Sequence, residues 1–170
     1  FQMVTLPENE CPAFFIPYLN IVEDDILKEL ESQTKSCVEF LKKIPNEKEL
    51  FRYAPGKWSV KEVIGHNTDT ERLKLYAALR VARNDQTPVP GFDEDAYVLA
   101  TDFNSKPIED LIEDFEIMRK GTISFFKSLS EEELKRIGNS SGKPTSVRAL
   151  FYFIIGHIRH HENILKERYF

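Results

Sequence analysis

Apolar residues recur at spacings of three and four along four long segments of the chain, and prolines and glycines separate these segments. This period is typical of α-helices that bury one face. Alternation between apolar and polar residues, the pattern of a half-buried strand, is convincing nowhere in the chain. The pattern therefore predicts an all-α protein whose main helices span about residues 22–44, 59–83, 108–129 and 145–168.

Two short motifs mark helix starts. Ser59 followed by Glu62 is the pattern of a capping box, in which the hydroxyl accepts from the Glu62 amide and the carboxylate accepts from the Ser59 amide. Ser130 and Glu133 repeat this pattern and predict a short helix that ends before residue 139. The polar segment that follows, at 139–144, is predicted to be a loop.

The longest connection between the predicted helices spans residues 84–107. Its prolines argue against continuous regular structure, and a connection of this length either crosses a compact domain or has a function. We expect the acidic turn at 93–95 to form ion pairs with Arg80 and Arg83. Four long helices with a crossover between the second and the third predict a four-helix bundle.

Composition and charge narrow the class of protein. A length of 170 residues suits a single domain over residues 1–170. The net charge of −5 gives no reason to expect a nucleic-acid partner. No apolar run approaches the ~20 residues of a membrane span, and the first ten residues lack the pattern of a signal peptide. Cys11 and Cys37 have no zinc-type spacing, and we expect two reduced thiols in a cytoplasmic protein without membrane association.

The candidate chemistry lies in the four histidines of the chain. His157 and His161 are four residues apart, which places them about 40° apart on one helix face. Helices of the H-E-x-x-H type offer two imidazoles to one metal ion at this spacing, although the glutamate of that motif is absent here. His160 points about 80° away from the middle of the pair, so we interpret it as a surface or supporting residue.

The fourth histidine, His66, lies beside the apolar stripe of the second predicted helix. Burying an imidazole without a partner costs about 1–3 kcal/mol, and one divalent ion held by His66, His157 and His161 would satisfy three at once. Three neutral ring nitrogens with an open fourth position form a known catalytic zinc arrangement. The alternative is that each is an ordinary core histidine with hydrogen-bond partners. Spacing alone does not bring His66 to the other two.

Several short motifs, in their order and spacing, resemble the DinB/YfiT-like superfamily over about residues 20–168. They are Lys-Trp-Ser-Val-Lys-Glu-Val-Ile-Gly-His at 57–66, Asp-Thr-Glu-Arg at 69–72, Arg-Val-Ala-Arg at 80–83, Pro-Gly-Phe-Asp at 90–93 and Gly-His-Ile-Arg-His-His at 156–161. The resemblance implies a four-helix bundle in up-down-down-up order. It also implies that His66 from the second helix, with His157 and His161 from the fourth, binds nickel, zinc or a similar ion.

The same resemblance implies that the protein is an enzyme. It also implies a homodimer, because members of the superfamily are often dimeric. Characterised relatives include transferases and isomerases that use low-molecular-weight thiols, and some members respond to DNA damage. We therefore expect a metal-dependent transferase that adds a low-molecular-weight thiol to a small electrophile. The alternatives are a metal-dependent hydrolase that uses metal-activated water, and a non-catalytic stress protein that binds a metal or small ligand.

Three further polar residues are candidates for substrate binding or for support of the histidines. Asp69 and Thr70 lie within one turn of His66, at about −60° and +40°. Arg168 follows His161 by seven residues and shares its predicted face, where it could hold an anionic substrate at the mouth of the bundle. The alternative for Arg168 is a cation that stabilises the C-terminus of its helix.

Overall fold

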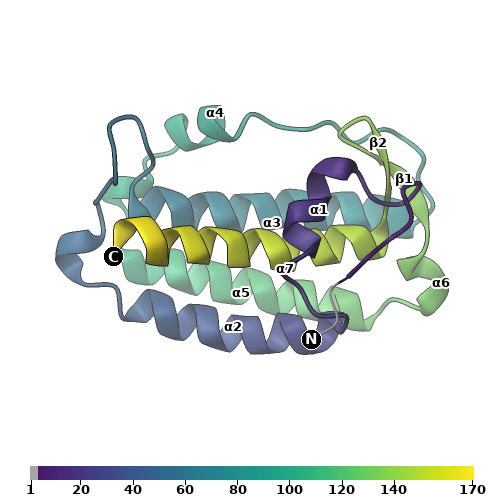
Figure 1. Cartoon of the computed structure of the whole chain (residues 1–170), viewed down its shortest axis with the longest axis horizontal. Helices are drawn as coiled ribbons and strands as arrows, with labels where there is room; N and C mark the ends of the chain where they lie inside the picture. The colour runs from purple at the N-terminus through teal and green to yellow at the C-terminus, as the bar shows by residue number, and fades with distance from the viewer. Residues whose placement is uncertain (1–3) are drawn as a thin grey trace.

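Four long helices form the body of the protein in a computed structural model that describes residues 4–170 (Figure 1). They are α2 (Ile26–Lys42), α3 (Val60–Ala82), α5 (Ile108–Lys127) and α7 (Val147–Ile164). The minor elements are η1 (Ala13–Phe15), α1 (Ile16–Leu19), η2 (Asn46–Lys48), α4 (Glu94–Leu99), η3 (Phe103–Ser105), α6 (Glu131–Leu134), β1 (Ile137–Ser140), β2 (Lys143–Ser146) and the π-helical turn η4 (Leu165–Tyr169). The predicted four-helix bundle is confirmed.

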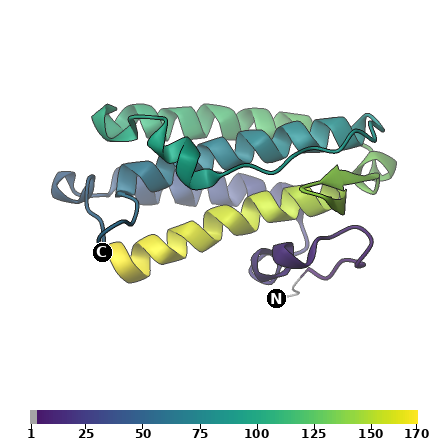
Figure 2. The same cartoon turned by 90° about the horizontal axis from the view of Figure 1, so that it is seen from above.

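The helices follow the up-down-down-up order. Figure 1 shows α2 and α7 running in one direction and α3 and α5 in the other. Helix α3 packs against both α7 and α5, and α2 packs against α5 and α7. Because α3 and α5 run in the same direction, the chain between them must return along the whole bundle, and Figure 2 shows this crossover lying along the outside. In the described part of the chain, no helix combines the length and apolar character needed to cross a membrane.

The boundaries of two long helices differ from the predicted ones for local reasons. Helix α2 begins at Ile26 and not near residue 22, because the Asp25 side chain accepts a hydrogen bond from the Lys28 amide and caps the helix there. The fourth helix continues to Tyr169, but its last turn is π-helical. Both predicted capping boxes, at Ser59 and Ser130, are present.

The segment predicted to be a loop at 139–144 belongs to a β-hairpin that the apolar pattern did not reveal. Strands β1 and β2 pair antiparallel, with Ile137 opposite Ser146. Ser141 and Gly142 turn the chain with positive φ angles of 54° and 80°. Strands of four residues are too short to show a clear alternation, so the prediction failed here.

The crossover is more ordered than predicted, and its acidic turn has other partners. The short helix α4 begins at Asp93, whose side chain accepts from the Ala96 amide. The expected ion pairs with this turn are wrong. Arg80 pairs with Asp85 at 2.7 Å, and Arg83 approaches Glu133 at 3.7 Å.

The interior consists of two apolar clusters with a polar layer between them. Buried polar positions along α3, which include His66, Thr70 and Glu71, lie between two groups of buried apolar residues. These groups are Val60, Val63 and Ile64 at one end and Ala77, Ala78, Val81 and Ala82 at the other. Glu71 is held by Arg119 at 2.6 Å and by the Thr122 hydroxyl at 3.0 Å, and all three are buried. The candidate histidines therefore lie in a polar layer that the apolar core encloses from both ends.

Candidate metal centre

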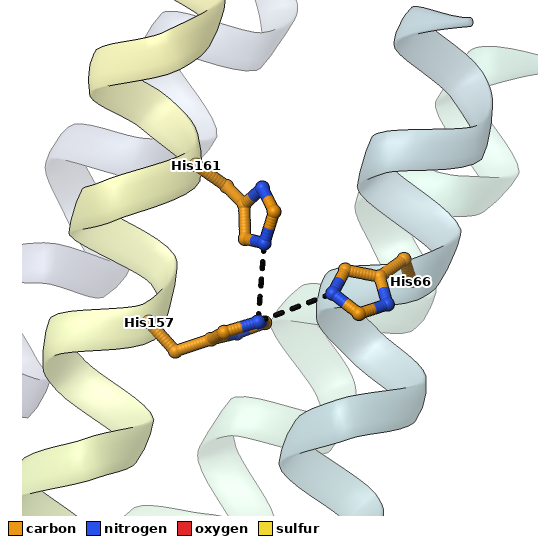
Figure 3. A group of neighbouring side chains, drawn as sticks. All are labelled: His66, His157 and His161. Carbon is orange, nitrogen blue, oxygen red and sulfur yellow. Dashed lines mark hydrogen bonds between the residues drawn. The ribbon is translucent and has the colours of Figure 1, made fainter. Parts of the chain in front are cut away.

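The three histidines matched by the resemblance meet in this polar layer (Figure 3). The Nε2 atom of His157 lies 3.1 Å from that of His66 and 3.1 Å from that of His161. All three potential ligand atoms lie within 4.8 Å of one another. His66 comes from α3 and the other two come from α7, so the packing of these helices brings together residues 91 positions apart.

Each of the two helices carries a glycine directly before its buried histidine, and each glycine allows another segment to approach closely. A Cβ on Gly65 would lie 2.4 Å from the Phe103 ring of the crossover. A Cβ on Gly156 would lie 2.2 Å from the carbonyl oxygen of Tyr18 in α1. Because these glycines lack a side chain, the crossover and the N-terminal segment can cover the helices beside the histidines.

The start of α3 also fixes the position of His66. The Ser59–Glu62 capping box sets where the helix begins, and Arg52 pairs with the Glu62 carboxylate at 2.6 Å. Trp58, directly before the cap, places its ring 4.5 Å from the ring of His66. Trp58 is therefore part of the wall of the histidine group as well as an anchor for the helix start.

Burial keeps these imidazoles in the neutral form. It lowers the pKa of His66 from 6.5 to about 4. Burial, together with the charges of His66 and His160, lowers the pKa of His161 to about 3. Burial and the neighbouring histidines also place the pKa of His157 well below its ordinary value. Metal ions bind the neutral imidazole, so the group is in the ligating form at neutral pH.

Two of the three separations fit a shared divalent ion, and the third, between His66 and His161, is within 4.8 Å. Two nitrogens that each lie about 2.0–2.1 Å from one metal, at angles between a right angle and the tetrahedral angle, are roughly 2.8–3.4 Å apart. The two measured separations of 3.1 Å fall within this interval. The donor set, three neutral imidazole nitrogens, suits zinc, nickel and related ions.

The residues predicted to support the histidines lie in different places. Thr70 is buried, with its hydroxyl oxygen 3.5 Å from Nδ1 of His66, where it helps to orient the ring so that Nε2 faces the other histidines. Asp69 is half-buried on another side of α3. Burial raises its pKa, and the charges that act on it are those of Arg72 and Asp114. The geometry thus connects Thr70, and not Asp69, with the candidate site.

Arg168 and His160 lie outside the group. The Arg168 guanidinium donates to the Tyr53 hydroxyl at 3.1 Å, and the wider winding of the π-helical turn takes it off the α-helical face used for the prediction. The ring of His160 lies 5.3 Å from that of His161 and 5.3 Å from that of Tyr18. His160 therefore borders the site as a half-buried neighbour.

The structure adds one acidic residue that sequence reasoning had assigned to another role. The carboxylate of Glu94, in the first turn of α4, lies 4.0 Å from Nε2 of His66, and its side chain is 57% exposed. Two cavities flank this turn. One, of about 270 Å³, is lined by His161, Trp58 and Asp95, and the other, of about 210 Å³, is lined by His157, Thr70 and Glu94. In the sequence, the feature that could have indicated Glu94 as a site residue was its place in an acidic turn of a long crossover.

A four-helix bundle of this topology places the protein in the class of DinB/YfiT-like helical proteins. A family model described as the DinB superfamily matches residues 29–165. The chain belongs to this superfamily.

Known proteins resemble this chain in sequence or in fold. A protein of Oceanobacillus iheyensis, provisionally named a metal-dependent hydrolase, is 27% identical over 118 residues, which cover 69% of this chain and 67% of that protein. YfiT from Bacillus subtilis, described as a probable metal-dependent hydrolase with an unusual four-helix bundle topology, superposes with a TM-score of 0.74 at 16% identity, covering 85% of this chain and 83% of YfiT. A mycothiol-dependent maleylpyruvate isomerase gives a TM-score of 0.67 at 11% identity, covering 85% of this chain and 61% of the isomerase.

Proposed function

We propose that this chain binds one divalent metal ion, nickel or zinc, through Nε2 of His66, His157 and His161, and acts on a small-molecule substrate. The observation that carries the proposal is the convergence of three neutral, largely buried ring nitrogens from two helices, with His157 at 3.1 Å from each of the others and all three within 4.8 Å. Burying such polar atoms is costly, and one shared cation would remove the cost. When bound, the ion would lower the pKa of a bound water or thiol and supply a nucleophile near neutral pH.

Glu94 is placed to act as a general base on a nucleophile held at the three histidines. Its carboxylate lies beside His66, so it is within reach of a small molecule held against the three histidines. Burial and the charges of Asp95 and Asp93 raise the pKa of Glu94, which brings it closer to the range in which a general base is effective. We infer that Glu94 accepts the proton of the attacking water. A metal-dependent hydrolase is the first candidate, because Glu94 provides the base that such a reaction needs and the Oceanobacillus iheyensis relative carries the name of that activity.

The thiol transferase expected from the resemblance is the second candidate. Its support is the structural likeness to a mycothiol-dependent isomerase, and the chain's own two thiols, Cys11 and Cys37, are both buried. Burial raises the pKa of Cys37 to about 12 and also raises that of Cys11. A thiol nucleophile would therefore arrive as a low-molecular-weight co-substrate, and Glu94 is placed to accept its proton. The homodimer, the cytoplasmic location and the single domain over 1–170 stay predictions.

Metal analysis tests the first part of the proposal. Protein purified without a histidine tag should contain about one nickel, zinc or similar ion per chain by elemental analysis. His66→Gln and His157→Gln should each lose that ion, and His160→Gln should retain it as a matched control. Full metal content in either of the first two variants would rule out the three-histidine site.

Activity assays then separate the candidate reactions. A hydrolase should cleave activated esters or amides without added thiol, and a transferase should consume monochlorobimane only when a low-molecular-weight thiol is present. Glu94→Gln should lower the turnover rate of whichever reaction is observed roughly 10²–10⁴-fold and leave the metal content unchanged. Glu109→Gln, an exposed change of the same charge on α5, is the control. Metal binding without either turnover would favour the non-catalytic binding protein.

A further inference from the structure

A buried lysine without an acidic partner lies two helical turns beyond His66. Lys74 follows His66 and Thr70 at intervals of eight and four residues, so all three share one face of α3. Lys74 is only 8% exposed. Within residues 4–170, no ion pair or hydrogen bond is formed by its ammonium group. Its contacts are the rings of Phe153, at 5.0 Å, and Phe15, at 5.6 Å.

Another lysine of the same helix shows what a buried lysine ordinarily does. Lys61 is also 8% exposed. Its ammonium approaches the Glu49 carboxylate at 3.5 Å and donates to the Asn104 carbonyl oxygen at 3.3 Å. Buried lysines are rare unless they are paired. Lys74 therefore has a desolvated positive charge and donors that the described chain leaves for another molecule.

The Lys74 side chain lines the cavity of about 210 Å³ that also reaches His157. The aromatic rings of the wall belong to Phe14, Tyr18, Phe92 and Phe153. Phe153 links the two ends of the cavity, because its ring stacks on His157 at 5.4 Å and also lies beneath the Lys74 ammonium at 5.0 Å.

The roof of this cavity is held in place by backbone pairing. The Val89 amide donates to the Asn139 carbonyl, and the Ser141 amide donates to the Val89 carbonyl, at 2.9 and 2.8 Å. This bridge fixes the hairpin to the crossover next to Gly91 and Phe92, which line the cavity with Ser141. The cavity, which is open to solvent on one side, is thus bordered by parts of the chain that are far apart in sequence.

Size and charge narrow the ligand that such a cavity would take. A volume of about 210 Å³ corresponds to roughly seven water molecules of the liquid, so a small molecule fits and a peptide does not. One ammonium balances one negative charge, and the aromatic walls favour a flat apolar body. A phosphate would call for more donors, of the kind that arginines or a helix N-terminus provide. Glu94 lies at the exposed edge of the cavity, beside the histidines.

We propose that this cavity binds a small carboxylic acid, with its carboxylate at the Lys74 ammonium, its flat apolar body between the aromatic rings, and its other end facing His157. The proposal deepens the proposed function, since it names the substrate class of the same site. Binding of the carboxylate itself does not require the metal. The carboxylate belongs either to the substrate or to a low-molecular-weight thiol co-substrate.

Calorimetric titration with benzoate and with the neutral, equally shaped benzamide tests the proposal on both the metal-free and the zinc-loaded protein. The wild type should bind benzoate at least tenfold more tightly than benzamide in both forms. Lys74→Met, which keeps the length of the side chain without its charge, should lose that preference and still bind zinc. Lys61→Met is the matched control and should keep the preference, because Lys61 already has its own partners.

Each outcome has a distinct meaning. An unchanged benzoate preference in Lys74→Met, or no preference in the wild type, would overturn the proposal. A Lys74-dependent preference in a protein that takes up no zinc would support it while refuting the three-histidine metal site. A comparison of the binding of 3-mercaptopropionate with that of propionate shows whether the carboxylate belongs to the substrate or to the thiol co-substrate. A tighter binding of the thiol acid that appears only with zinc and depends on Lys74 would assign the carboxylate to the co-substrate, and equal binding would assign it to the substrate.

Discussion

Substitution of His66 by glutamine should weaken the acid sensitivity of the metal-free protein. Burial lowers the folded-state pKa of His66 from 6.5 to about 4. As the pH falls below 6.5, the unfolded chain takes up the proton first, and the free energy of unfolding decreases until the pH reaches about 4. A shift of this size corresponds to about 3 kcal/mol of stability that is present at pH 7 and lost by pH 4. Glutamine has a side chain that does not titrate in this range.

Urea unfolding followed by circular dichroism, with a chelator present, measures this difference at pH 7 and pH 4. The free energy of unfolding of the wild type should fall by about 3 kcal/mol more than that of His66→Gln over this interval. The other titrating groups contribute to both proteins, so the difference reports His66. His160→Gln is the control, since His160 lies at the half-buried edge of the group and its change should leave most of the loss in place. Equal losses in wild type and His66→Gln would refute the view that His66 is buried in its neutral form.

Three further predictions concern the frame around the histidines. Arg119→Met should lower the free energy of unfolding by about 3–5 kcal/mol, because Glu71 then stays buried without its ion-pair partner. The double variant that also carries Glu71→Met should recover most of this stability in a urea titration. A double variant as unstable as Arg119→Met would contradict this reasoning. Gly156→Ala should cost about 1–3 kcal/mol, visible as a lower melting temperature, because the new Cβ would meet the Tyr18 carbonyl oxygen. Ser59→Ala should cost about 0.5–2 kcal/mol through loss of the cap of α3, and Ser59→Asp should retain most of the stability in the same measurement.

The helices could be predicted because their signals are local. Apolar spacing, the two capping boxes and the prolines act over a few neighbouring residues, and the packed structure agrees with them. The relation between His157 and His161 is local too, since four residues along a helix bring two side chains to one face. The hairpin at residues 137–146 was missed because its strands are too short for a periodic signal.

The contacts between distant segments were decided by tertiary packing alone. His66 reaches His157 because α3 packs on α7, and the periodicity of either helix is compatible with other partners. Glu94 lies beside His66 for the same reason, because the path of the crossover depends on every contact along it. The pairing of Arg80 with Asp85, in contrast, is local, since five residues separate them. By itself the sequence determined which residues can share a helix face. Only the folded chain determined which faces meet, because that depends on the sum of packing and burial over the whole core.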